Sequence, residues 1–486
     1  MRSSATPGLE PRGIPVRTIL LGVAGVMLVA LGGSGAGAVV KRDPLLAATS
    51  LSWIRYGHGQ DLATAVLYVG LALVVWAWVR LGRMVLRGHV GSRAVLAAVG
   101  AWTLPLLFAP PLFSKDIYSY LAQGQLALNG LDPYEVGPAV LQSPLSDNVS
   151  WVWQNTPAPY GPLFVLLSEG VVWLTAGSVI GGVVLLRLVL VAGLGLVCWS
   201  LPGLARHLGG RPPVALWFAA ANPLVLVHLI GGAHNDMLMV GLMAAGVLLV
   251  LDGKHVGGIV LVTLGVAVKA TAAVALPFLV LVWAARMPGP RRAAIGRAIG
   301  RGVAVFAVVF TATSLIAGRD LGWLPALSTS SMIVNWLSLP SAVGDFAHTL
   351  VSVFVHLDQG VFLTVARAIG SALLVFIAWR QWRAAEDGGP NAVFRAAVTM
   401  LAVALLSPAT LPWYFAWPLV LGAGLAWTVT GLTTVAFFST WLLLVTFPNG
   451  DTALYSWGYL LVAVLLSALA AVSLTKDDPL RLSGKP

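Results

Sequence analysis

The sequence predicts an all-α polytopic membrane protein with about 14 transmembrane helices and further external juxtamembrane helices. Of the 486 residues 58% are hydrophobic and 10% are charged, and the mean hydropathy is +0.88, which excludes an ordinary soluble globule. Apolar runs of about 20 residues recur along the chain, and each can cross a bilayer as a helix. The alternating segments of a transmembrane β-barrel are absent. We expect one membrane domain over residues 1–486.

The apolar runs give the expected spans in chain order. Those on the N-terminal side cover residues 17–40, 62–86, 93–110, 180–205, 212–232 and 236–252. The first lacks a cleavage motif, so we expect a retained anchor. The next run, 256–285, is too long for one span and contains Lys269, so we expect two short helices that meet at this lysine. The remaining spans are expected at 300–317, 361–380, 392–408, 411–427, 430–447 and 455–474.

The basic residues predict the orientation, because Lys and Arg accumulate in cytoplasmic loops. With both termini in the cytoplasm, most of the 29 Lys and Arg residues fall in such loops, including Arg2, Arg12, Arg481 and Lys485. This path requires that a helix over residues 160–177 does not cross. The net charge of +11 then reflects orientation in a plasma membrane with anionic lipids, and no nucleic-acid partner is expected. Cys198 is the single cysteine, so no intrachain disulfide can form.

The acidic residues show the opposite bias and gather on the external side. Two long external loops cover residues 111–178 and 318–360, and both are rich in aromatic residues and proline. Any chemistry is therefore expected to face outward. The first loop is expected to carry juxtamembrane helices and the catalytic acid.

That first loop opens with a helix-start pattern around Asp116. Ser114 is a good N-cap, and Asp116 would lie in the first helical turn, where the helix dipole favours a carboxylate. At helical spacing Asp116, Tyr120 and Gln123 share one face. An acid at this position often does no more than stabilise a helix start. Its expected place at a membrane surface favours a functional carboxylate here.

Farther along the loop, aromatic residues precede a second helix. Trp151, Trp153 and the Tyr160-Gly161-Pro162 corner lead into an apolar segment, and proline is favourable in the first turn of a helix. Anchoring at the membrane interface accounts for such Trp and Tyr residues without any ligand. Stacking on a sugar face is the alternative.

Three consecutive polar residues, His234, Asn235 and Asp236, occupy a short external turn between two spans. Asn235 or Asp236 could cap the following helix. Alternatively, His234 and Asp236 could bind hydroxyls, a phosphate or a divalent ion at the mouth of a membrane cavity. His234 with one carboxylate is a weak metal signal, because a complete site needs further ligands.

Lys269 is the charged residue whose position most needs explaining. Its surroundings in sequence are apolar, and a buried ammonium group is costly unless it meets a counter-charge or reaches water. Snorkelling to the interface is one solution. At the external tip of a half-helix pair, Lys269 could instead bind a phosphate, and we favour this role. Arg187 and Glu169 are lesser candidates, and Trp413-Tyr414 is expected to belong to the interface belt.

Four motifs in this order resemble the actinobacterial polyprenyl-phosphomannose-dependent alpha-1,6-mannosyltransferases, which belong to the GT-C membrane glycosyltransferases. The similarity extends over nearly the whole chain. One departure is that many relatives place the acid of the first external loop after the first span, whereas here it follows the third. The motifs are Ser114-Lys115-Asp116-Ile117-Tyr118-Ser119-Tyr120, Ala158-Pro159-Tyr160-Gly161-Pro162-Leu163, Gly232-Ala233-His234-Asn235-Asp236 and Trp336-Leu337-Ser338-Leu339-Pro340.

The resemblance implies a GT-C fold and transfer of mannose from polyprenyl-phosphate mannose to the alpha-1,6-mannan backbone of lipomannan and lipoarabinomannan. The acceptor would be a mannosylated glycolipid on the extracytoplasmic face. Asp116 would be the general base. The donor phosphate would meet Lys269, Lys115 and His234, and the sugar or acceptor would meet Tyr118, Tyr120, Gln123, Tyr160, Asn235, Asp236 and Trp336.

No cofactor is expected. A divalent cation could take part, but we expect none to be essential because cationic side chains are available for the leaving phosphate. Three alternatives remain: a GT-C enzyme for another polyprenyl-phosphate sugar, a transporter or flippase for a lipid-linked sugar, and a non-catalytic lipid-binding scaffold. The sequence determines neither the acceptor length nor the oligomeric state.

Overall fold

The computed structural model describes residues 13–41, 43, 46, 49–476 and 479, and within them the protein is built from helices, with only two isolated β-bridges. A helix is present at each predicted apolar run, which confirms the all-α class. Arg2, Arg12, Arg481 and Lys485, which support the predicted orientation, lie outside the described residues.

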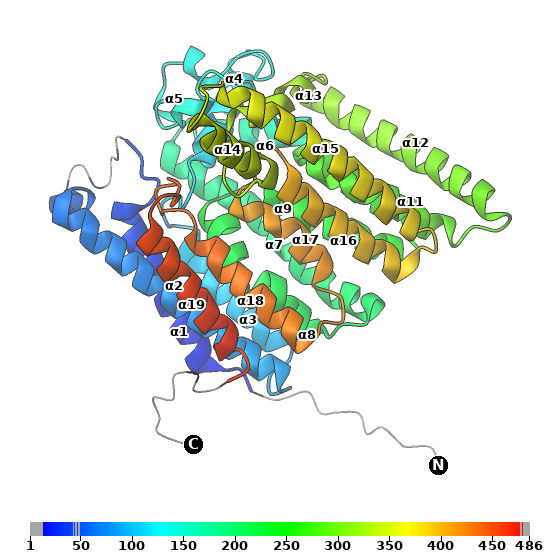
Figure 1. Ribbon diagram of the computed structural model, residues 1–486, viewed down its shortest axis with the longest axis horizontal. Coiled ribbons are helices and arrows are strands. Elements are labelled where there is room, and N and C mark those ends of the chain that lie inside the picture. The colour runs from blue at the N-terminus through cyan, green and yellow to red at the C-terminus, as the bar shows by residue number, and fades with distance from the viewer. Residues whose placement is uncertain (1–12, 42, 44–45, 47–48, 477–478, 480–486) are drawn as a thin grey trace.

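The helices of one side of the molecule come from both ends of the chain (Figure 1). The N-terminal pair packs along its length, α19 packs against α2, and α18 packs against α19. Glycines on α1 permit this close approach, since a Cβ on Gly32 would lie 2.5 Å from the carbonyl oxygen of Ala63. These helices are α1 (Val16–Ala36), α2 (Gly57–Leu86), α3 (Ser92–Leu106), α18 (Val429–Leu444) and α19 (Trp457–Ser473).

The remaining helices form the other side of the molecule, and α4, α5, α13 and α14 lie at its upper end in the view (Figure 1). The helices of 14 residues or more are α7 (Val179–Leu208), α9 (Asp236–Leu251), α10 (His255–Val268), α12 (Arg291–Ala317), α14 (Leu339–Ser352), α15 (Gln359–Ala384) and α16 (Gly389–Leu406). The shorter ones are α4 (Asp116–Leu128), α5 (Pro144–Asp147), α6 (Pro162–Leu174), α8 (Pro212–Ala215), α11 (Leu276–Ala284), α13 (Trp323–Ala326) and α17 (Ala416–Gly422).

Single-turn and two-turn segments complete the chain. The 3₁₀ segments are η1 (Ser50–Arg55), η2 (Pro138–Val140), η3 (Trp151–Trp153), η6 (Ala270–Ala275), η7 (Leu327–Met332) and η8 (Pro412–Phe415). Two segments, η4 (Leu216–Ala220) and η5 (Val225–Gly231), are π-helical. Such wide turns are rare and often occur at functional sites.

The predicted number of spans is not confirmed. Among the described residues six helices are long and apolar enough to cross a membrane, or seven if the pair Pro212–Ala220 and Val225–Gly231, bent by 51°, counts as one span. The six are α1, α2, α7, α12, α15 and α16. Other apolar helices, including α3, α9, α10, α18 and α19, are shorter than an ordinary span. This is nevertheless the architecture of a membrane protein.

One predicted break and one predicted helix are confirmed, and that this helix does not cross the membrane stays a prediction. The run at 256–285 breaks at Lys269, whose backbone is extended (φ −152°, ψ 129°) between α10 and η6. The helix predicted near residues 160–177 is α6, with 13 residues. At 1.5 Å per residue it is about 20 Å long, well short of a bilayer core of about 30 Å.

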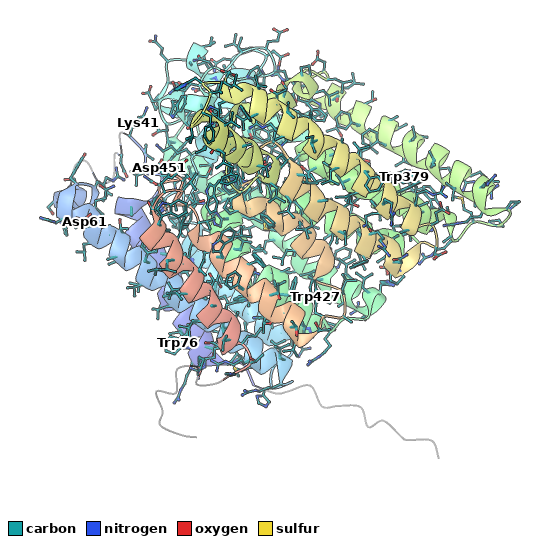
Figure 2. All side chains as sticks on the ribbon, in the orientation of Figure 1. Lys41, Asp61, Trp76, Trp379, Trp427 and Asp451 are labelled. Atoms are coloured by element: carbon teal, nitrogen blue, oxygen red, sulfur yellow. The ribbon has the colours of Figure 1, made fainter. Side chains whose placement is uncertain are left out.

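Figure 2 places Lys41, Asp61 and Asp451 toward the upper left of the view, where loops collect, and Trp76 below them at the lower left. Trp379 and Trp427 lie toward the right. The helix α4 and the short α5 lie at the upper end of the view in Figure 1, away from the start of α1 and the end of α19. The predicted loop over residues 111–178 therefore lies at the opposite end from the described chain termini.

A fully buried arginine fixes the backbone beneath this loop. Arg187 of α7 is 0% exposed and donates hydrogen bonds to main-chain carbonyl oxygens on two separate segments. Its Nε and Nη2 reach Ile230 and Gly231 at 3.0 and 2.6 Å, and its Nη1 reaches Leu107 at 3.2 Å and also Ala109. It thereby joins the end of α3 to the end of η5, the two segments that lead into Asp116 and His234. Arg187, a lesser candidate for the functional site, therefore has a structural role.

We predict that Arg187→Met lowers the thermal unfolding midpoint of the detergent-solubilised protein strongly. Each buried carbonyl left without a donor costs about 1–3 kcal/mol, and up to four would be affected. Arg292→Met, at an exposed position at the start of α12, is the control and should unfold like the wild type. Equal midpoints for the two variants would contradict this role of Arg187.

Candidate active site

The candidate acid Asp116 begins α4 and keeps contact with solvent. Lys115 precedes it as the N-cap residue, and the Ser114 hydroxyl accepts a hydrogen bond from the Asp116 amide at 3.0 Å. The predicted helix start is therefore correct to within one residue. The Asp116 side chain is 20% exposed, whereas most of α4 is buried against α6 and α7. A carboxylate that is held at a helix start and still reaches solvent can meet a substrate.

His234 lies beside this carboxylate. Its Nδ1 is 3.4 Å from the Asp116 Oδ2, and its ring stacks on Trp413 with centroids 3.6 Å apart and planes at 17°. His234 is fully buried, and neither ring nitrogen has a hydrogen-bond partner. The imidazole is thus held in place by stacking, and its polar edge faces the carboxylate.

Both carboxylate oxygens of the second candidate acid, Asp236, accept hydrogen bonds within the protein. Its side chain is 0% exposed, and Lys269 Nζ lies 2.9 and 2.8 Å from its two oxygens. Trp417 Nε1 donates a third hydrogen bond to Oδ1 at 2.6 Å. Because both oxygens already accept hydrogen bonds, Asp236 is poorly placed to take a proton from a substrate.

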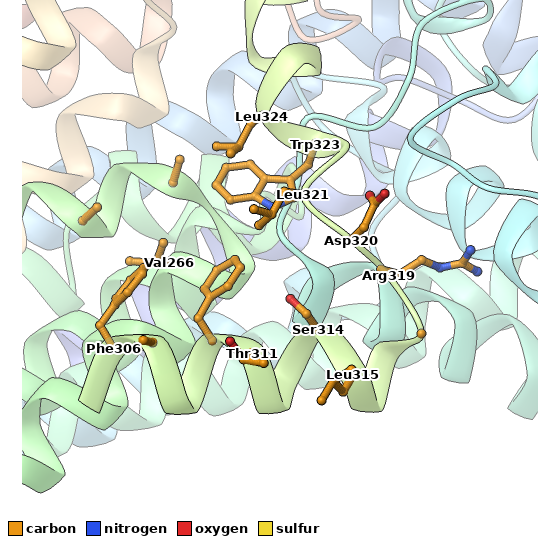
Figure 3. A pocket seen from close by; sticks show the side chains of 15 residues that line it. Val266, Phe306, Thr311, Ser314, Leu315, Arg319, Asp320, Leu321, Trp323 and Leu324 are labelled. Atoms are coloured by element: carbon orange, nitrogen blue, oxygen red, sulfur yellow. The ribbon is translucent and has the colours of Figure 1, made fainter. Parts of the chain in front are cut away.

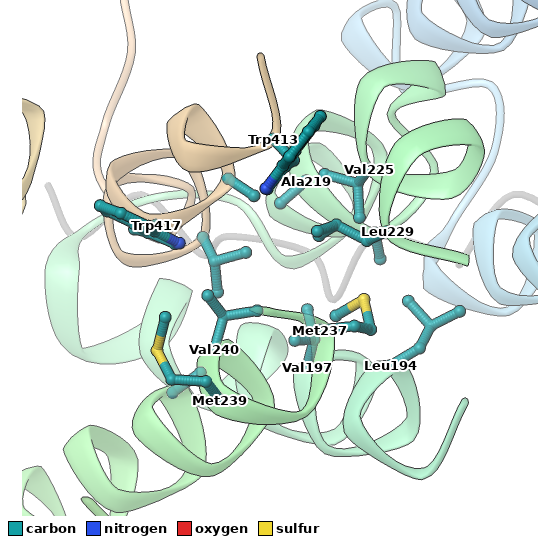
Figure 4. Packing of buried hydrophobic residues seen from close by; sticks show 14 of the residues in the cluster. Leu194, Val197, Ala219, Val225, Leu229, Met237, Met239, Val240, Trp413 and Trp417 are labelled. Atoms are coloured by element: carbon teal, nitrogen blue, oxygen red, sulfur yellow. The ribbon is translucent and has the colours of Figure 1, made fainter. Parts of the chain in front are cut away.

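Lys269 therefore meets a counter-charge, one of the two solutions that the sequence left open. The ammonium group also lies over the rings of Tyr414 and Trp417, 4.7 and 5.5 Å from their centroids, and its side chain remains 15% exposed. Cation–π contacts of this kind stabilise an ammonium group away from bulk water. Figure 4 shows the buried apolar cluster to which Trp413 and Trp417 belong, with both rings above Met237 and Val240 in the view.

The interpretation of Trp413-Tyr414 as an interface belt is wrong. Trp413 is 4% exposed and stacks on His234, and Tyr414 stacks on Trp417 with centroids 4.4 Å apart. The sequence signal that we missed is the spacing of Trp413 and Trp417. These residues are one helical turn apart, so both can face one site.

Tyrosines of the first loop complete the wall beside Asp116. The Tyr120 ring meets the Tyr160 ring edge to face at 5.0 Å. The Gly161 amide donates to the Val268 carbonyl oxygen at 3.2 Å, and a Cβ at Gly161 would lie 2.3 Å from the Ala267 carbonyl oxygen. The predicted corner at Tyr160 is thus fixed against the end of α10, next to Lys269. Burial raises the pKa of Tyr120 and of Tyr160, so both stay neutral phenols.

Other predicted site residues have different environments. Tyr118 is buried and donates to the Ala38 carbonyl oxygen at 2.8 Å, so its hydroxyl supports the fold and not a ligand. Trp336 donates to Thr452 at 3.2 Å and meets Trp441 edge to face. The Lys115 side chain is exposed, and Gln123 is 4% exposed within α4.

Asn235 is the N-cap residue of α9, but its side chain makes no capping hydrogen bond. Both its amide nitrogen and its amide oxygen are buried without a partner. His228, seven residues earlier in η5, has two buried ring nitrogens without partners as well. Buried polar atoms of this kind are costly and point to a ligand or to water.

The backbone is strained three residues before Asp116 and directly before His234. Phe113 and Ala233 have φ values of 63° and 57°, in the left-handed region that non-glycine residues rarely adopt. The Phe113 amide is held by the Pro448 carbonyl oxygen at 2.7 Å. Strain of this kind persists where the surrounding structure imposes it, and it clusters at functional sites.

The electrostatics keep Asp116 ionised. Burial alone would raise the pKa of Asp116, but the nearby His234 imidazole and the Lys269 charge outweigh it and hold this pKa below its ordinary value of 3.8. The described residues contain no group of three or more His, Cys, Asp or Glu that could hold a metal ion. The expectation that no metal is essential stays a prediction.

We predict that His234→Phe shifts the acidic limb of the pH profile of kcat/KM to higher pH. Phe keeps the stack on Trp413 but removes the largest of the contributions that offset burial, so the pKa of Asp116 rises. In the function proposed below Asp116 acts as a base, which works only when deprotonated, so activity is then lost at less acidic pH. His356→Phe, at an exposed position, is the control. Superimposable acidic limbs for His234→Phe and wild type would contradict this assignment.

We also predict strong coupling between Asp236 and Lys269. Either Asp236→Asn or Lys269→Met alone should destabilise the protein, because removing one partner of a buried ion pair typically costs about 3–5 kcal/mol. The double variant should lose less than the sum of the single losses. The unfolding midpoints of the four proteins in detergent measure this, and additive losses would exclude the coupling.

Two family models match the chain. Residues 19–285 match the model described as the N-terminal domain of alpha-(1→6)-mannopyranosyltransferase, and residues 340–476 match the MptB C-terminal domain. No solved structure gives a significant match.

Similar proteins carry the same description. The chain is 42% identical to alpha-(1→6)-mannopyranosyltransferase A of Mycobacterium tuberculosis over 95% of this chain and 89% of the relative. It is 33% identical to the protein of that name in Corynebacterium glutamicum, over 93% of this chain and 97% of the relative. A probable alpha-(1→6)-mannopyranosyltransferase of Mycolicibacterium smegmatis is 31% identical over 97% of this chain and 89% of the relative.

Proposed function

Because the chain belongs to the alpha-(1→6)-mannopyranosyltransferase family and is therefore a glycosyltransferase, we propose that it moves mannose from polyprenyl-phosphate mannose to an alpha-1,6-mannan acceptor. The acceptor in this proposal is the mannosylated glycolipid that becomes lipomannan and lipoarabinomannan. The proposal includes a GT-C fold, cytoplasmic termini and a site on the extracytoplasmic face. The opposite placement of α4 and the described chain ends supports that arrangement (Figure 1).

The observation that carries the catalytic assignment is the contrast between two neighbouring acids. Asp236 is 0% exposed and accepts hydrogen bonds on both oxygens, whereas the Asp116 side chain is 20% exposed. Of this pair, Asp116 is the one that an acceptor hydroxyl can approach. A base must lie within about 3 Å of the proton that it removes.

The proposed reaction is a single displacement at the anomeric carbon. The acceptor oxygen forms a bond to this carbon as its proton passes to the Asp116 carboxylate. The bond from the anomeric carbon to the phosphate oxygen breaks, and polyprenyl phosphate leaves with the electron pair. Because the pKa of Asp116 is low, this residue is a weak base, so positioning and charge stabilisation must supply much of the rate.

Charge stabilisation is assigned to the cationic side of the site. Lys269 is held by Asp236 but remains 15% exposed, so its ammonium group can donate a further hydrogen bond to a phosphate oxygen. His234, next to Asp116, and the exposed Lys115 are the other proposed donors to phosphate. The residues proposed to contact the sugars are Tyr120, Tyr160, Gln123 and Asn235. The buried side-chain amide of Asn235 has no hydrogen-bond partner within the protein, which supports its proposed contact with a sugar.

We predict that Asp116→Asn lowers mannose transfer at least about a hundredfold, the usual contribution of a general base. Membranes with equal amounts of each protein receive radiolabelled polyprenyl-phosphate mannose and a short alpha-1,6-mannoside. Asp147→Asn, an exposed acid of the same loop, is the matched control and should keep wild-type activity.

Two other outcomes would count against the proposal. Transfer that survives Asp116→Asn would exclude Asp116 as the base. Absence of mannose transfer by the wild type, with another polyprenyl-phosphate sugar accepted, would replace the proposed donor.

A further inference from the structure

Two pockets of the molecule differ in the side chains that line them. A cavity of about 960 Å³ beside α12 is lined mainly by apolar side chains such as Phe306 and Leu324 (Figure 3). A smaller pocket of about 90 Å³ lies between the start of α14 and the segment 446–454, and half of its lining residues are polar. These polar residues are Asn335, Ser341, Asp345 and Thr452, and Trp336 forms part of the wall. A sugar presents several hydroxyl groups, so the smaller pocket has the more suitable lining for it.

Two polar side chains of the smaller pocket keep an atom free for a ligand. Asn335 Oδ1 accepts a hydrogen bond from the Leu337 amide at 2.8 Å, and Asp345 Oδ1 accepts one from Gln359 Nε2 at 2.6 Å. Within the described part of the chain, neither Asn335 Nδ2 nor Asp345 Oδ2 takes part in a further hydrogen bond. The pocket thus offers one neutral donor and one charged acceptor, and a hydroxyl group can both donate and accept.

Trp336 supplies a flat apolar wall beside these two groups. Its Nε1 donates to Thr452 Oγ1 at 3.2 Å, and Trp441 meets its ring edge to face with centroids 5.8 Å apart. The ring is thereby held in one orientation, and the residue remains partly exposed. An aromatic ring of this kind can cover the C–H face of a pyranose while the hydroxyl groups at the edge reach polar neighbours.

Hydrogen bonds fix the floor of the pocket before any ligand binds. Arg367 of α15 donates to Ser341 Oγ at 3.1 Å and to the Ile333 carbonyl oxygen at 2.9 Å. Ser338, the N-cap residue of α14, donates to the Ser407 carbonyl oxygen at the end of α16 at 2.6 Å. These contacts join the segment before α14 to its first turn and to α16. A site held in this way needs little ordering when a ligand binds.

A tight turn connects the pocket to the segment that leads into Asp116. Gly450 lies at this turn with a φ of 98°, and a Cβ at this position would lie 3.5 Å from the Ser114 Cα. Thr452 of the pocket is two residues after Gly450, and Asp116 is two residues after Ser114. Two residues span at most about 7 Å. A short oligosaccharide with one end at Asp116 can therefore reach the pocket.

We propose that this pocket is an outer acceptor subsite, an inference that rests on the proposed function. It binds a mannose unit of the acceptor behind the unit whose hydroxyl group reacts at Asp116. The C–H face of this mannose lies on Trp336. Asp345 accepts a hydrogen bond from one of its hydroxyl groups, and Asn335 donates to another.

The size of the pocket limits what it can enclose. Its volume of about 90 Å³ is well below the range of roughly 300–1,000 Å³ that is usual for sites that enclose a small molecule. It therefore takes the hydroxyl edge of a single sugar unit, and the rest of the mannan stays in solvent. An enzyme with this subsite binds an acceptor of several mannose units more tightly than a single mannose.

The test uses a matched pair of variants on α14. Asp345→Ala removes the charged acceptor from the pocket, and alanine favours the helical conformation, so α14 is kept. Thr349→Ala, one turn later on the same helix, changes an exposed residue that does not line the pocket. The acceptors are methyl alpha-mannoside, with one unit, and alpha-1,6-mannotriose, with three. Both are assayed with polyprenyl-phosphate mannose, and mannotriose binding is measured by NMR titration without the donor.

We expect Asp345→Ala to raise the KM for mannotriose about tenfold with kcat little changed, because a hydrogen bond to a charged group is lost. Its KM for methyl alpha-mannoside should equal that of the wild type, since a single unit at Asp116 does not reach the pocket. Trp336→Leu, which removes the flat ring, should have the same selective effect. Thr349→Ala should match the wild type with both acceptors.

Several results would overturn the inference. An equal rise in KM for both acceptors would show a general disturbance of the site. An unchanged KM for mannotriose in Asp345→Ala, or an equal rise in Thr349→Ala, would exclude Asp345 as a sugar contact. If the wild type transfers no mannose, the proposed function fails, and the titration then decides separately. Mannotriose binding that Asp345→Ala weakens and Thr349→Ala keeps would support the subsite, and no binding to the wild type would exclude it.

Discussion

The buried ion pair between Asp236 and Lys269 is the interaction on which the arrangement of the site depends. It joins the start of α9 to the break after α10, and Trp417 adds α17 to the same carboxylate. An unpaired charge at this depth would be costly, so these three elements must come together in one geometry. The aromatic rings over Lys269 and the stack of His234 on Trp413 follow from that geometry. Asp116 is then left as the neighbouring carboxylate with access to solvent.

The pair also explains which features were predictable from sequence. The break at Lys269 and the helix start near Asp116 were predicted, because a charged residue in an apolar run and a serine before an acid are local signals. The partner of Lys269 was not, since Asp236 lies 33 residues away and only the packing of α9 against α10 brings them together. The role of Trp413 was missed for the same reason. The number of spans was predicted less well, because hydropathy does not separate a short buried helix from a full crossing.

The site uses two kinds of polar group for different purposes. Asp236, Lys269 and Arg187 are satisfied by partners within the protein, and they hold backbone segments in position. His228, His234 and Asn235 keep buried polar atoms without partners. A folded protein usually satisfies its buried polar groups, so in the proposed function the substrate supplies the missing contacts of this second set. Of the two strained residues, Ala233 directly precedes His234, and Phe113 lies three residues before Asp116.

The central claim is that one carboxylate, Asp116, acts as the base in a single displacement. Such a reaction inverts the configuration at the anomeric carbon, whereas a two-step reaction through a covalent intermediate retains it. The most direct test is to determine, by NMR, the anomeric configuration of the mannosyl group in the lipid donor and in the first product formed from it. The account predicts opposite configurations. The same configuration in both would contradict it, because retention requires a nucleophile that attacks the sugar directly.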